Sequence, residues 1–336
     1  MFTTTLCTIL GVKHPIMSAG IGAAAGAELV AAVSNAGGCG VLGTAALSAK
    51  FVQTEIGRIR KLTDKSFGVN LVLPIIRRGQ FEVCLEERVP VVMLFWGDPT
   101  GYVKQAHSQG MKIIMQVGSV DEARAAVDAG VDAVIAQGAE AGGHVKGQTA
   151  LSVLVPAVVG AVGPIPVVAS GGIANGQGLV AALSLGAQGA SIGTRFLASL
   201  EANSSRAYKD RVVESTSEDT VYTQLFDVGW SAPHRVLRNW AYIRWDAAGR
   251  CNSGQRPGEG DTVGTMTSGG QRVDVPSYSA YVPGPDSENL LDEMALYAGQ
   301  SCSLIASVLS ASDIVETIVD EANDVLKKLN ELHCSE

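Results

Sequence analysis

The chain has 336 residues, of which 46% are hydrophobic and 17% are charged, and its formal net charge is −8 at pH 7. A chain of this length can bury the core of one barrel-sized domain with an insertion, or the cores of two smaller domains. The negative balance leaves no electrostatic footprint for nucleic acid or for an anionic membrane surface, which argues against both as partners. A small-molecule substrate is the expected partner, and homo-oligomerisation stays open.

The six cysteines are scattered, with no C-x-x-C pair and no Cys/His cluster at zinc spacing. They are interpreted as reduced thiols of a cytoplasmic protein, and no metal site is expected. Residues 1–5 lack the basic region and apolar core of a signal peptide. The least charged stretch, residues 151–170, is interrupted by Pro156, Pro164 and Pro166. A helix followed by a buried strand is therefore expected there, and not a membrane span.

In chain order, short apolar runs alternate with segments of helical spacing. The expected strands cover residues 14–19, 40–43, 67–73, 90–96, 112–117, 133–137, 166–170 and 189–196. The expected helices cover residues 28–36, 48–62, 80–88, 100–109, 120–129, 151–162 and 176–185. Uninterrupted apolar runs are typical of parallel strands that are buried on both faces.

Eight such strands, each followed by a helix-length segment, predict an α/β fold of the (β/α)8 TIM-barrel type. An open, doubly wound sheet is the alternative. The count of eight strands favours the barrel, and so does the absence of a G-x-G-x-x-G turn after the first strand.

The composition changes after Arg206. Residues 207–286 hold Trp230, Trp240 and Trp245 together with many polar, glycine and proline residues. This segment is interpreted as an inserted subdomain after strand eight that caps the C-terminal face of the barrel; a packing subdomain without contact to the site is the alternative. The barrel then consists of residues 1–206 and 287–336, with residues 290–298 and 301–332 expected as outer helix.

Two glycine turns lie at the strand ends where barrel enzymes hold phosphate. Ser170, Gly171 and Gly172 follow the seventh strand, and Gly193 and Thr194 belong to the eighth. Backbone N–H groups at such turns, together with the two hydroxyls, form an anion site. A single glycine pair is usually an ordinary tight turn, but two at these positions predict a phosphorylated ligand.

Three carboxamides interrupt otherwise apolar strands: Asn70, Gln116 and Gln137. A carboxamide offers both a donor and an acceptor, which suits the edge of a flat heterocycle. Buried amides need partners, either in protein and water or in a ligand. Because three strands contribute one amide each, a bound heterocycle is the more economical interpretation.

The sixth strand ends in a glycine-rich loop that reaches His144. An imidazole presented by such a loop suits a base that acts on a bound ligand, whereas a solvent-exposed loop histidine is the alternative. His14, His107, His234 and His333 are interpreted as structural or surface residues. Glu140 with one imidazole is a weak metal signal. The chain also has no G-x-S-x-G segment of a serine hydrolase.

These motifs resemble the nitronate monooxygenase (2-nitropropane dioxygenase-like) family. The resemblance is carried by P-I-M at residues 15–17, A-V-S-N-A-G-G at 32–38, Q-G-A-E-A-G-G-H at 137–144, S-G-G-I at 170–173, G-T-R-F at 193–196 and A-L-Y-A-G-Q at 295–300. It implies noncovalently bound FMN at the barrel mouth, with His144 beside the flavin as base or polar anchor for the substrate. By motif, the implied cofactor contacts are Asn70, Gln137, Gly142, Gly172, Ser191, Ile192, Gly193 and Thr194. The predicted cofactor site also includes Gln116, Gly143, Ser170 and Gly171.

Two features depart from the family pattern. The first strand is followed by S-A-G-I-G at residues 18–22 where the family usually has A-P-M, and the tryptophan-bearing insertion is unusual. The expected activity is oxidation of alkyl nitronates with O2 to a carbonyl compound and nitrite. The alternatives are an NAD(P)H-dependent reductase of quinones or enoyl thioesters on the same scaffold, and a non-catalytic protein that binds a phosphorylated ligand.

Overall fold

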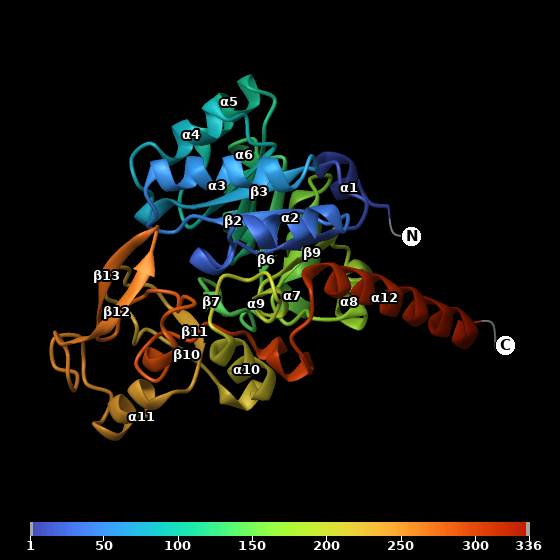
Figure 1. Cartoon of the computed structure of the whole chain (residues 1–336). Coiled ribbons are helices and arrows are strands. Elements are labelled where there is room, and N and C mark those ends of the chain that lie inside the picture. Colours follow the sequence, from blue (N-terminus) through green and yellow to red (C-terminus); the bar gives the residue numbers. More distant parts are fainter. Residues whose placement is uncertain (1–2, 334–336) are drawn as a thin grey trace.

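The computed structural model describes residues 3–333. Met1, Phe2, the predicted free thiol Cys334 and the side chain of His333 lie outside the described part. Eight parallel strands form one sheet in the order β1-β9-β8-β6-β5-β4-β3-β2 (Figure 1). They are β1 (Ile16–Ser18), β2 (Gly40–Gly43), β3 (Phe67–Val72), β4 (Val91–Phe95), β5 (Lys112–Val117), β6 (Ala133–Gln137), β8 (Val167–Ser170) and β9 (Gly189–Ile192).

The sheet closes on itself between its first and last members, β1 and β2. Ser18 N donates to Cys39 O (3.0 Å) and Cys39 N donates to Ile16 O (2.9 Å). Met17 also forms a parallel bridge with Cys39. Closure pairs the two edges that an open sheet would expose. The predicted TIM barrel is therefore confirmed, and the open doubly wound sheet is wrong.

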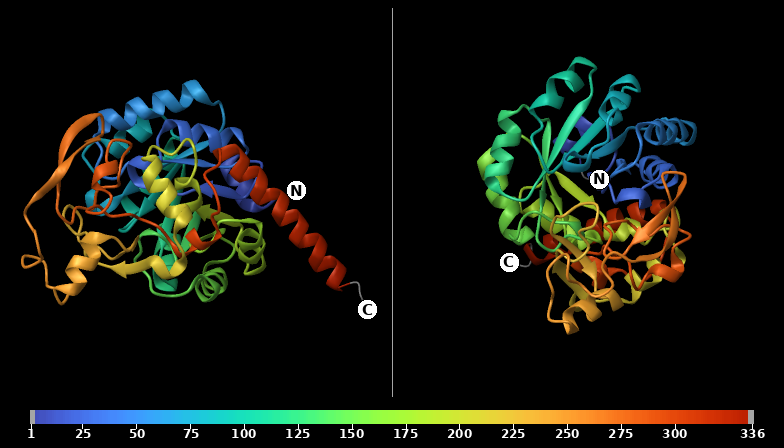
Figure 2. Two further views of the ribbon diagram at one scale, coloured as in Figure 1. Left: turned by 60° about the horizontal axis from the view of Figure 1, so that its bottom comes forward. Right: turned by 90° about the vertical axis from the view of Figure 1, so that its left-hand side faces the viewer.

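Helices surround the ring of strands on its outer side (Figure 2). They are α2 (Ala27–Asn35), α3 (Ala49–Leu62), α4 (Gln80–Glu86), α5 (Thr100–Ser108), α6 (Val120–Asp128), α7 (Leu151–Val162) and α8 (Gly176–Ser184). The long helix α12 (Ala311–His333) packs against α8 and α2 and so completes this outer layer. Its C-terminal half projects beyond the body of the molecule (Figure 2).

The hydrophobic core has two layers, because each strand buries both of its faces. Val41, Met93 and Ile135 belong to the cluster inside the barrel, which also contains Leu6 and Leu10 of α1 (Thr5–Leu10). Helix α1 therefore closes the N-terminal end of the barrel. The larger cluster fills the space between the strands and the outer helices. With one end plugged and the interior packed, the loops at the C-terminal end are left to form a site.

Two of the expected elements are wrong in the structure. The eighth strand ends at Ile192, and residues 194–196 belong to the short helix α9 (Thr194–Leu197). Residues 291–294 form a turn after the short 3-10 helix η4 (Glu288–Leu290), residues 295–299 are not helical, and α12 begins only at Ala311. Met294, Ala295, Leu296 and Ala298 are each 0% exposed. Their apolar spacing reflects burial on all sides and not one face of a helix.

The segment after the barrel's last strand has more regular structure than its composition indicates. It contains α10 (Arg206–Glu214), β10 (Thr220–Thr223), β11 (His234–Leu237), α11 (Trp240–Ala247), and a hairpin of β12 (Thr262–Ser268) and β13 (Gln271–Pro276). Strand β11 lies between β10 and β7 (Gly143–His144), so the segment is joined to the glycine-rich loop after β6. The bounds 207–286 for an inserted subdomain stay a prediction.

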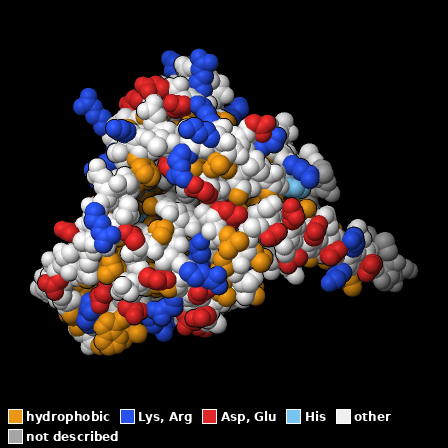
Figure 3. Space-filling view, viewed as in Figure 1, with side chains coloured by type: hydrophobic (Ala, Val, Ile, Leu, Met, Phe, Trp, Pro, Cys, Tyr) orange, Lys and Arg blue, Asp and Glu red, His pale blue; other side chains and the backbone are white. Residues whose placement is uncertain are grey.

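On the face shown in Figure 3, acidic and basic side chains are interspersed, and neither charge forms a large patch. Within residues 3–333, no helix is at once long enough and apolar enough to cross a bilayer. Among residues 3–333, Cys7, Cys39, Cys84, Cys251 and Cys302 form no disulfide.

Arg256 connects the loops of the inserted segment from a buried position. Its side chain is 3% exposed and lies 2.8 Å from the Asp227 carboxylate, with Glu259 as a second ionic partner. It also donates to Leu225 O (2.6 Å) and its guanidinium lies 4.6 Å from the ring centre of Tyr278. A buried cation held by two carboxylates and a ring fixes three loops at one point.

We expect Arg256→Met to lower the free energy of unfolding by about 3–5 kcal/mol, because it leaves two carboxylates in a largely buried place without their cation. Urea titration followed by circular dichroism measures the change. The control Arg206→Met removes an exposed i,i+4 pair with Asp210, which is worth roughly 0.3–0.5 kcal/mol. Equal effects of the two substitutions would contradict the role assigned to Arg256.

Candidate active site

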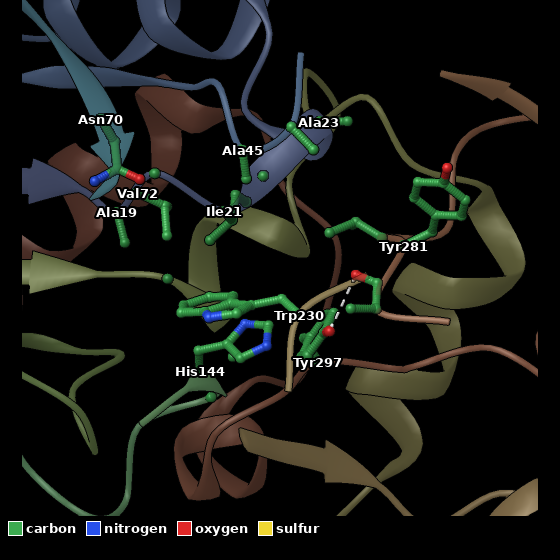
Figure 4. A pocket seen from close by; sticks show the side chains of 18 of the residues that line it. Ala19, Ile21, Ala23, Ala45, Asn70, Val72, His144, Trp230, Tyr281 and Tyr297 are labelled. Atoms are coloured by element: carbon green, nitrogen blue, oxygen red, sulfur yellow. Dashed lines mark hydrogen bonds between the residues drawn. The ribbon is translucent and has the colours of Figure 1, made fainter. Parts of the chain in front are cut away.

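A cavity of about 500 Å³ lies at the C-terminal ends of the barrel strands. This volume is within the range of small-molecule and cofactor sites. Its walls come from the strand ends, from the inserted segment and from the chain around Tyr297 (Figure 4). In the view of Figure 4, Asn70 and Val72 lie on one side of the cavity, Tyr281 lies on the other, and Trp230 covers the ring of His144.

The structure brings nearly all of the predicted site residues into this one cavity. The lining includes Asn70, Gln116, Gln137, Gly142, Gly143, His144, Ser170, Gly171, Gly172, Ser191, Gly193 and Thr194. Ile192 does not line it. This residue is 1% exposed and belongs to the core between the strands and the outer helices. Residues alternate across a strand, so the neighbour of Ser191 faces away from the cavity.

The three carboxamides differ in how far the protein satisfies them. Asn70 Nδ2 donates to Met93 O at 3.4 Å, a long bond. Gln137 Nε2 donates to His144 O (3.0 Å), whereas its buried Oε1 has no hydrogen-bond partner. Gln116 is half-buried at the end of β5. An unpaired buried carbonyl costs about 1–3 kcal/mol, so Gln137 Oε1 indicates a ligand that donates a hydrogen bond there.

The inner end of the cavity is built to bind an anion. Gly171 and Gly172 have φ angles of +110° and +69°, which side-chain-bearing residues rarely adopt. The buried Ser191 Oγ has no partner, and Thr194 Oγ accepts from Gly299 N (3.0 Å), which leaves the threonine hydroxyl proton free to donate. Turns of this kind direct backbone N–H groups toward a bound phosphate.

The glycine pair before His144 has a packing role that the sequence does not reveal. A Cβ on Gly142 would overlap Gly299 N and the backbone of Ala298. This close approach brings the chain just after Tyr297 against the loop after β6. Gly142 is therefore required at that position whether or not a ligand touches it.

His144 is fixed by a two-residue strand pairing. It lies opposite His234 in the β7–β11 ladder, and Val145 N donates to Pro233 O (3.0 Å). The Trp230 ring stacks on the imidazole with a centroid distance of 3.9 Å and a tilt of 33°. The Tyr297 ring lies 5.4 Å away. The backbone and both neighbouring rings restrict where His144 can point.

Burial sets the protonation state of His144. It lowers the pKa of the imidazole well below its ordinary value of 6.5, and the neighbouring His234 adds to the shift. The buried Nε2 atom has no hydrogen-bond partner in the structure. His144 is therefore neutral at pH 7, with one nitrogen available to a ligand. The alternative of a freely solvated loop residue does not fit this environment.

His234, the first residue of β11, fits its interpretation as a structural residue. Its Nδ1 lies 2.9 Å from Ala232 O and its Nε2 accepts from Phe226 N (3.3 Å). Both ring nitrogens are used, and burial lowers its pKa to about 4. This neutral ring lies edge-on to His144 at 5.4 Å.

Glu140 is used structurally as well. Both of its carboxylate oxygens accept from Leu151 N, at 3.0 and 3.1 Å, at the start of α7. A carboxylate at this position stabilises the N-terminus of a helix. Among residues 3–333, no group of three or more His, Cys, Asp and Glu side chains could hold a metal ion.

The sequence does not predict every residue of the lining, and three unpredicted ones bear on the chemistry: Arg77, Trp230 and Tyr297. The sequence did contain an indication for Trp230, because three of the four tryptophans lie in the segment predicted to cap the barrel. Tyr297 belongs to a segment predicted as helix, so its approach to His144 could not be foreseen. Arg77 has no distinguishing neighbour in the sequence apart from Arg78.

Comparisons with known proteins agree with this geometry. The model of the nitronate monooxygenase family matches residues 3–81 and 75–321. A probable nitronate monooxygenase of Staphylococcus aureus is 34% identical over 267 residues, which cover 66% of this chain and 75% of that protein. A (3aS,4S,5R,7aS)-5-hydroxy-7a-methyl-1-oxo-octahydro-1H-indene-4-carboxyl-CoA dehydrogenase of Mycobacterium tuberculosis is 37% identical over 238 residues. That match spans 70% of this chain and 66% of the mycobacterial protein's length.

Solved structures show the same relationship. FabK from Thermotoga maritima superimposes with a TM-score of 0.84 at 34% identity, over 99% of this chain and 100% of that one. A nitroalkane oxidase from Streptomyces ansochromogenes gives a TM-score of 0.77 at 28% identity, over 96% and 99% of the two chains. The family match covers most of the chain, and the relatives share its fold from end to end. The chain therefore belongs to the nitronate monooxygenase family of oxidoreductases.

Proposed function

We propose that the chain is an FMN-dependent nitronate monooxygenase, which oxidises alkyl nitronates with O2 to a carbonyl compound and nitrite. One observation carries the proposal: the neutral imidazole of His144, with a free and buried Nε2, shares a cavity with an anion-binding turn and an unpaired amide carbonyl. A cofactor and a small polar substrate fit these separate groups. The family relationship supports the same reaction class.

The residues present fit FMN. Its phosphate would be held by Ser170, Gly171 and Gly172 together with Gly193 and Thr194, mainly through backbone N–H groups. The unpaired Gln137 Oε1 and Ser191 Oγ are the polar atoms that would meet the rest of the cofactor, with Asn70 nearby in the lining. FMN bound there would supply a ring that accepts electrons from the substrate and passes them to O2.

The low pKa of His144 distinguishes its two predicted roles. A neutral imidazole that resists protonation is a weak base, so it serves first as a hydrogen-bonding anchor for the nitronate. A bound anion would raise the pKa of the imidazole and make proton transfer easier. Trp230 and Tyr297 border the ring and limit the approach of water, which strengthens the hydrogen bond to the substrate.

A second candidate is an NAD(P)H-dependent reductase of quinones or enoyl thioesters. It is favoured because apolar side chains of the β12–β13 hairpin, Met266 and Val273, also line the cavity and could contact an apolar substrate larger than a small nitronate. The full-length likeness to FabK points the same way. Anaerobic mixing with NADH or NADPH separates the two candidates, since rapid bleaching of the flavin absorbance favours the reductase. A purified protein that is colourless and takes up no FMN would favour the non-catalytic alternative.

We expect His144→Ala to lower nitronate turnover by about 10²–10⁴-fold, because the substrate loses its anchor or base. Oxygen consumption measures the rate, and visible absorbance checks that FMN occupancy is unchanged. His107→Ala is the matched control, since that histidine is exposed on α5 and pairs with Asp132. If the fully FMN-loaded His144→Ala protein turned over nitronate as fast as the wild type, the proposed role of His144 would be wrong.

We expect Trp230→Ala to raise the pKa of His144 toward 6.5, because losing the stacked indole admits water to a ring whose pKa burial has lowered. NMR titration of labelled histidine measures the shift. The wild-type imidazole should stay neutral until the pH falls well below 6.5, so the acid limb of kcat/KM should lie there too. Trp240→Ala, at a residue 56% exposed on α11, should leave the pKa unchanged. An identical shift in both variants would refute this explanation.

A further inference from the structure

The outer end of the cavity has a rigid rim on its barrel side. Gln80, which is 1% exposed, donates from Nε2 to Thr44 O and Leu47 O, both at 2.8 Å. Its Oε1 accepts from Arg77 N at 3.1 Å. One buried amide therefore joins the loop after β2 to the loop after β3. Arg77 is held at this rim by its backbone while its side chain stays exposed.

The β12–β13 hairpin forms the opposite side of the opening. Its tip rests on the start of α3, because a Cβ on Gly269 would lie 3.4 Å from the Leu47 side chain and one on Gly270 would lie 3.7 Å from the Phe51 ring. Figure 1 shows this end of the hairpin near the start of α3. The hairpin's own cation, Arg272, is paired with Asp286 at 2.9 Å. Its charge is therefore compensated within the hairpin side.

The charge of the cavity differs from that of the chain. The whole chain has a net charge of −8, yet the described lining residues include no aspartate or glutamate and a single arginine or lysine, Arg77. Arg78 follows it, also exposed. Within residues 3–333, neither arginine has an ion-pair partner or a side-chain hydrogen bond. Arg77 lines the cavity and Arg78 is its exposed neighbour in the sequence. Two adjacent guanidinium groups without carboxylate partners attract a polyanion.

Apolar surface connects this rim with the inner part of the cavity. The residues concerned are Leu47, Val72, Ile75, Met266, Val273 and Tyr281. The predicted phosphate site of FMN, at the glycine turns after β8 and β9, uses no lysine or arginine of the lining. The cavity therefore has two separate places that can bind negative charge. Backbone N–H groups of the glycine turns form the first, and Arg77 forms the second. Apolar side chains line the passage between them.

We propose that Arg77 and Arg78 form a second ligand site, which takes the phosphate-bearing end of a nucleotide-linked ligand whose apolar or reactive end extends along the passage toward His144. An acyl-coenzyme A thioester and NADPH share this chemistry. The inference rests on the second candidate function, the NAD(P)H-dependent reductase. The site is a binding site only, and no bond forms or breaks at the arginines.

Isothermal titration calorimetry of the FMN-loaded protein at low salt tests the site. Butanoyl-coenzyme A and NADP⁺ are the two probes, because they are the product forms, a saturated thioester and an oxidised nicotinamide, of the proposed reductase. We expect Arg77→Gln and Arg78→Gln each to weaken binding of at least one probe by about fivefold to tenfold, as loss of an exposed guanidinium–phosphate contact does. Added salt should weaken wild-type binding to the same probe. The probe that responds identifies the source of the phosphate.

Arg88→Gln is the matched control, since Arg88 is an exposed arginine just beyond the other end of α4. It should change neither dissociation constant by more than about twofold. The inference fails if wild-type protein binds neither probe, or if the Arg77, Arg78 double substitution leaves both dissociation constants unchanged. The reductase function fails separately, if NADH and NADPH do not bleach the flavin although the probes bind.

Discussion

The candidate site depends on the pairing of β7 with β11. Two residues, Gly143 and His144, pair with Arg235 and His234, and this joins the loop after β6 to a segment about ninety residues later in the chain. Arg235 extends the connection, because its guanidinium donates to Ala139 O at 2.9 Å. Without this pairing, Gly143 and His144 would lose their strand partner, and the direction of the His144 side chain would be less restricted. A rigid barrel and a short added sheet together fix one imidazole.

Burial around His144 has two linked consequences. The rings of Trp230 and Tyr297 and the neighbouring His234 exclude water, which lowers the pKa of His144 and keeps it neutral. The same exclusion leaves polar atoms such as Gln137 Oε1 and His144 Nε2 without partners. Unpaired buried atoms cost free energy in the ligand-free protein, so they are tolerated best where a ligand later satisfies them. The site is arranged in advance for polar groups of a ligand.

Different groups are available to bind negative charge at the two ends of the cavity. At the inner end, glycine turns offer backbone N–H groups, which are fixed dipoles and need no charged side chain. At the outer end, Arg77 offers a full charge in contact with solvent, where salt screens it. A permanently bound cofactor suits the first arrangement. A ligand that arrives and leaves suits the second, because exposed ion pairs contribute modest affinity and assist encounter.

The sequence by itself determined the barrel, since eight uninterrupted apolar runs with intervening helical segments have few other ways to bury both faces of every strand. It also determined which polar residues end those strands, and parallel strands in a closed ring bring their ends together. Only the tertiary structure decided the neutral state of His144, the contact of Trp230 with it and the non-helical course of residues 291–299. These depend on contacts between segments far apart in the chain, and local spacing carries no information about which distant residue will cover a given side chain.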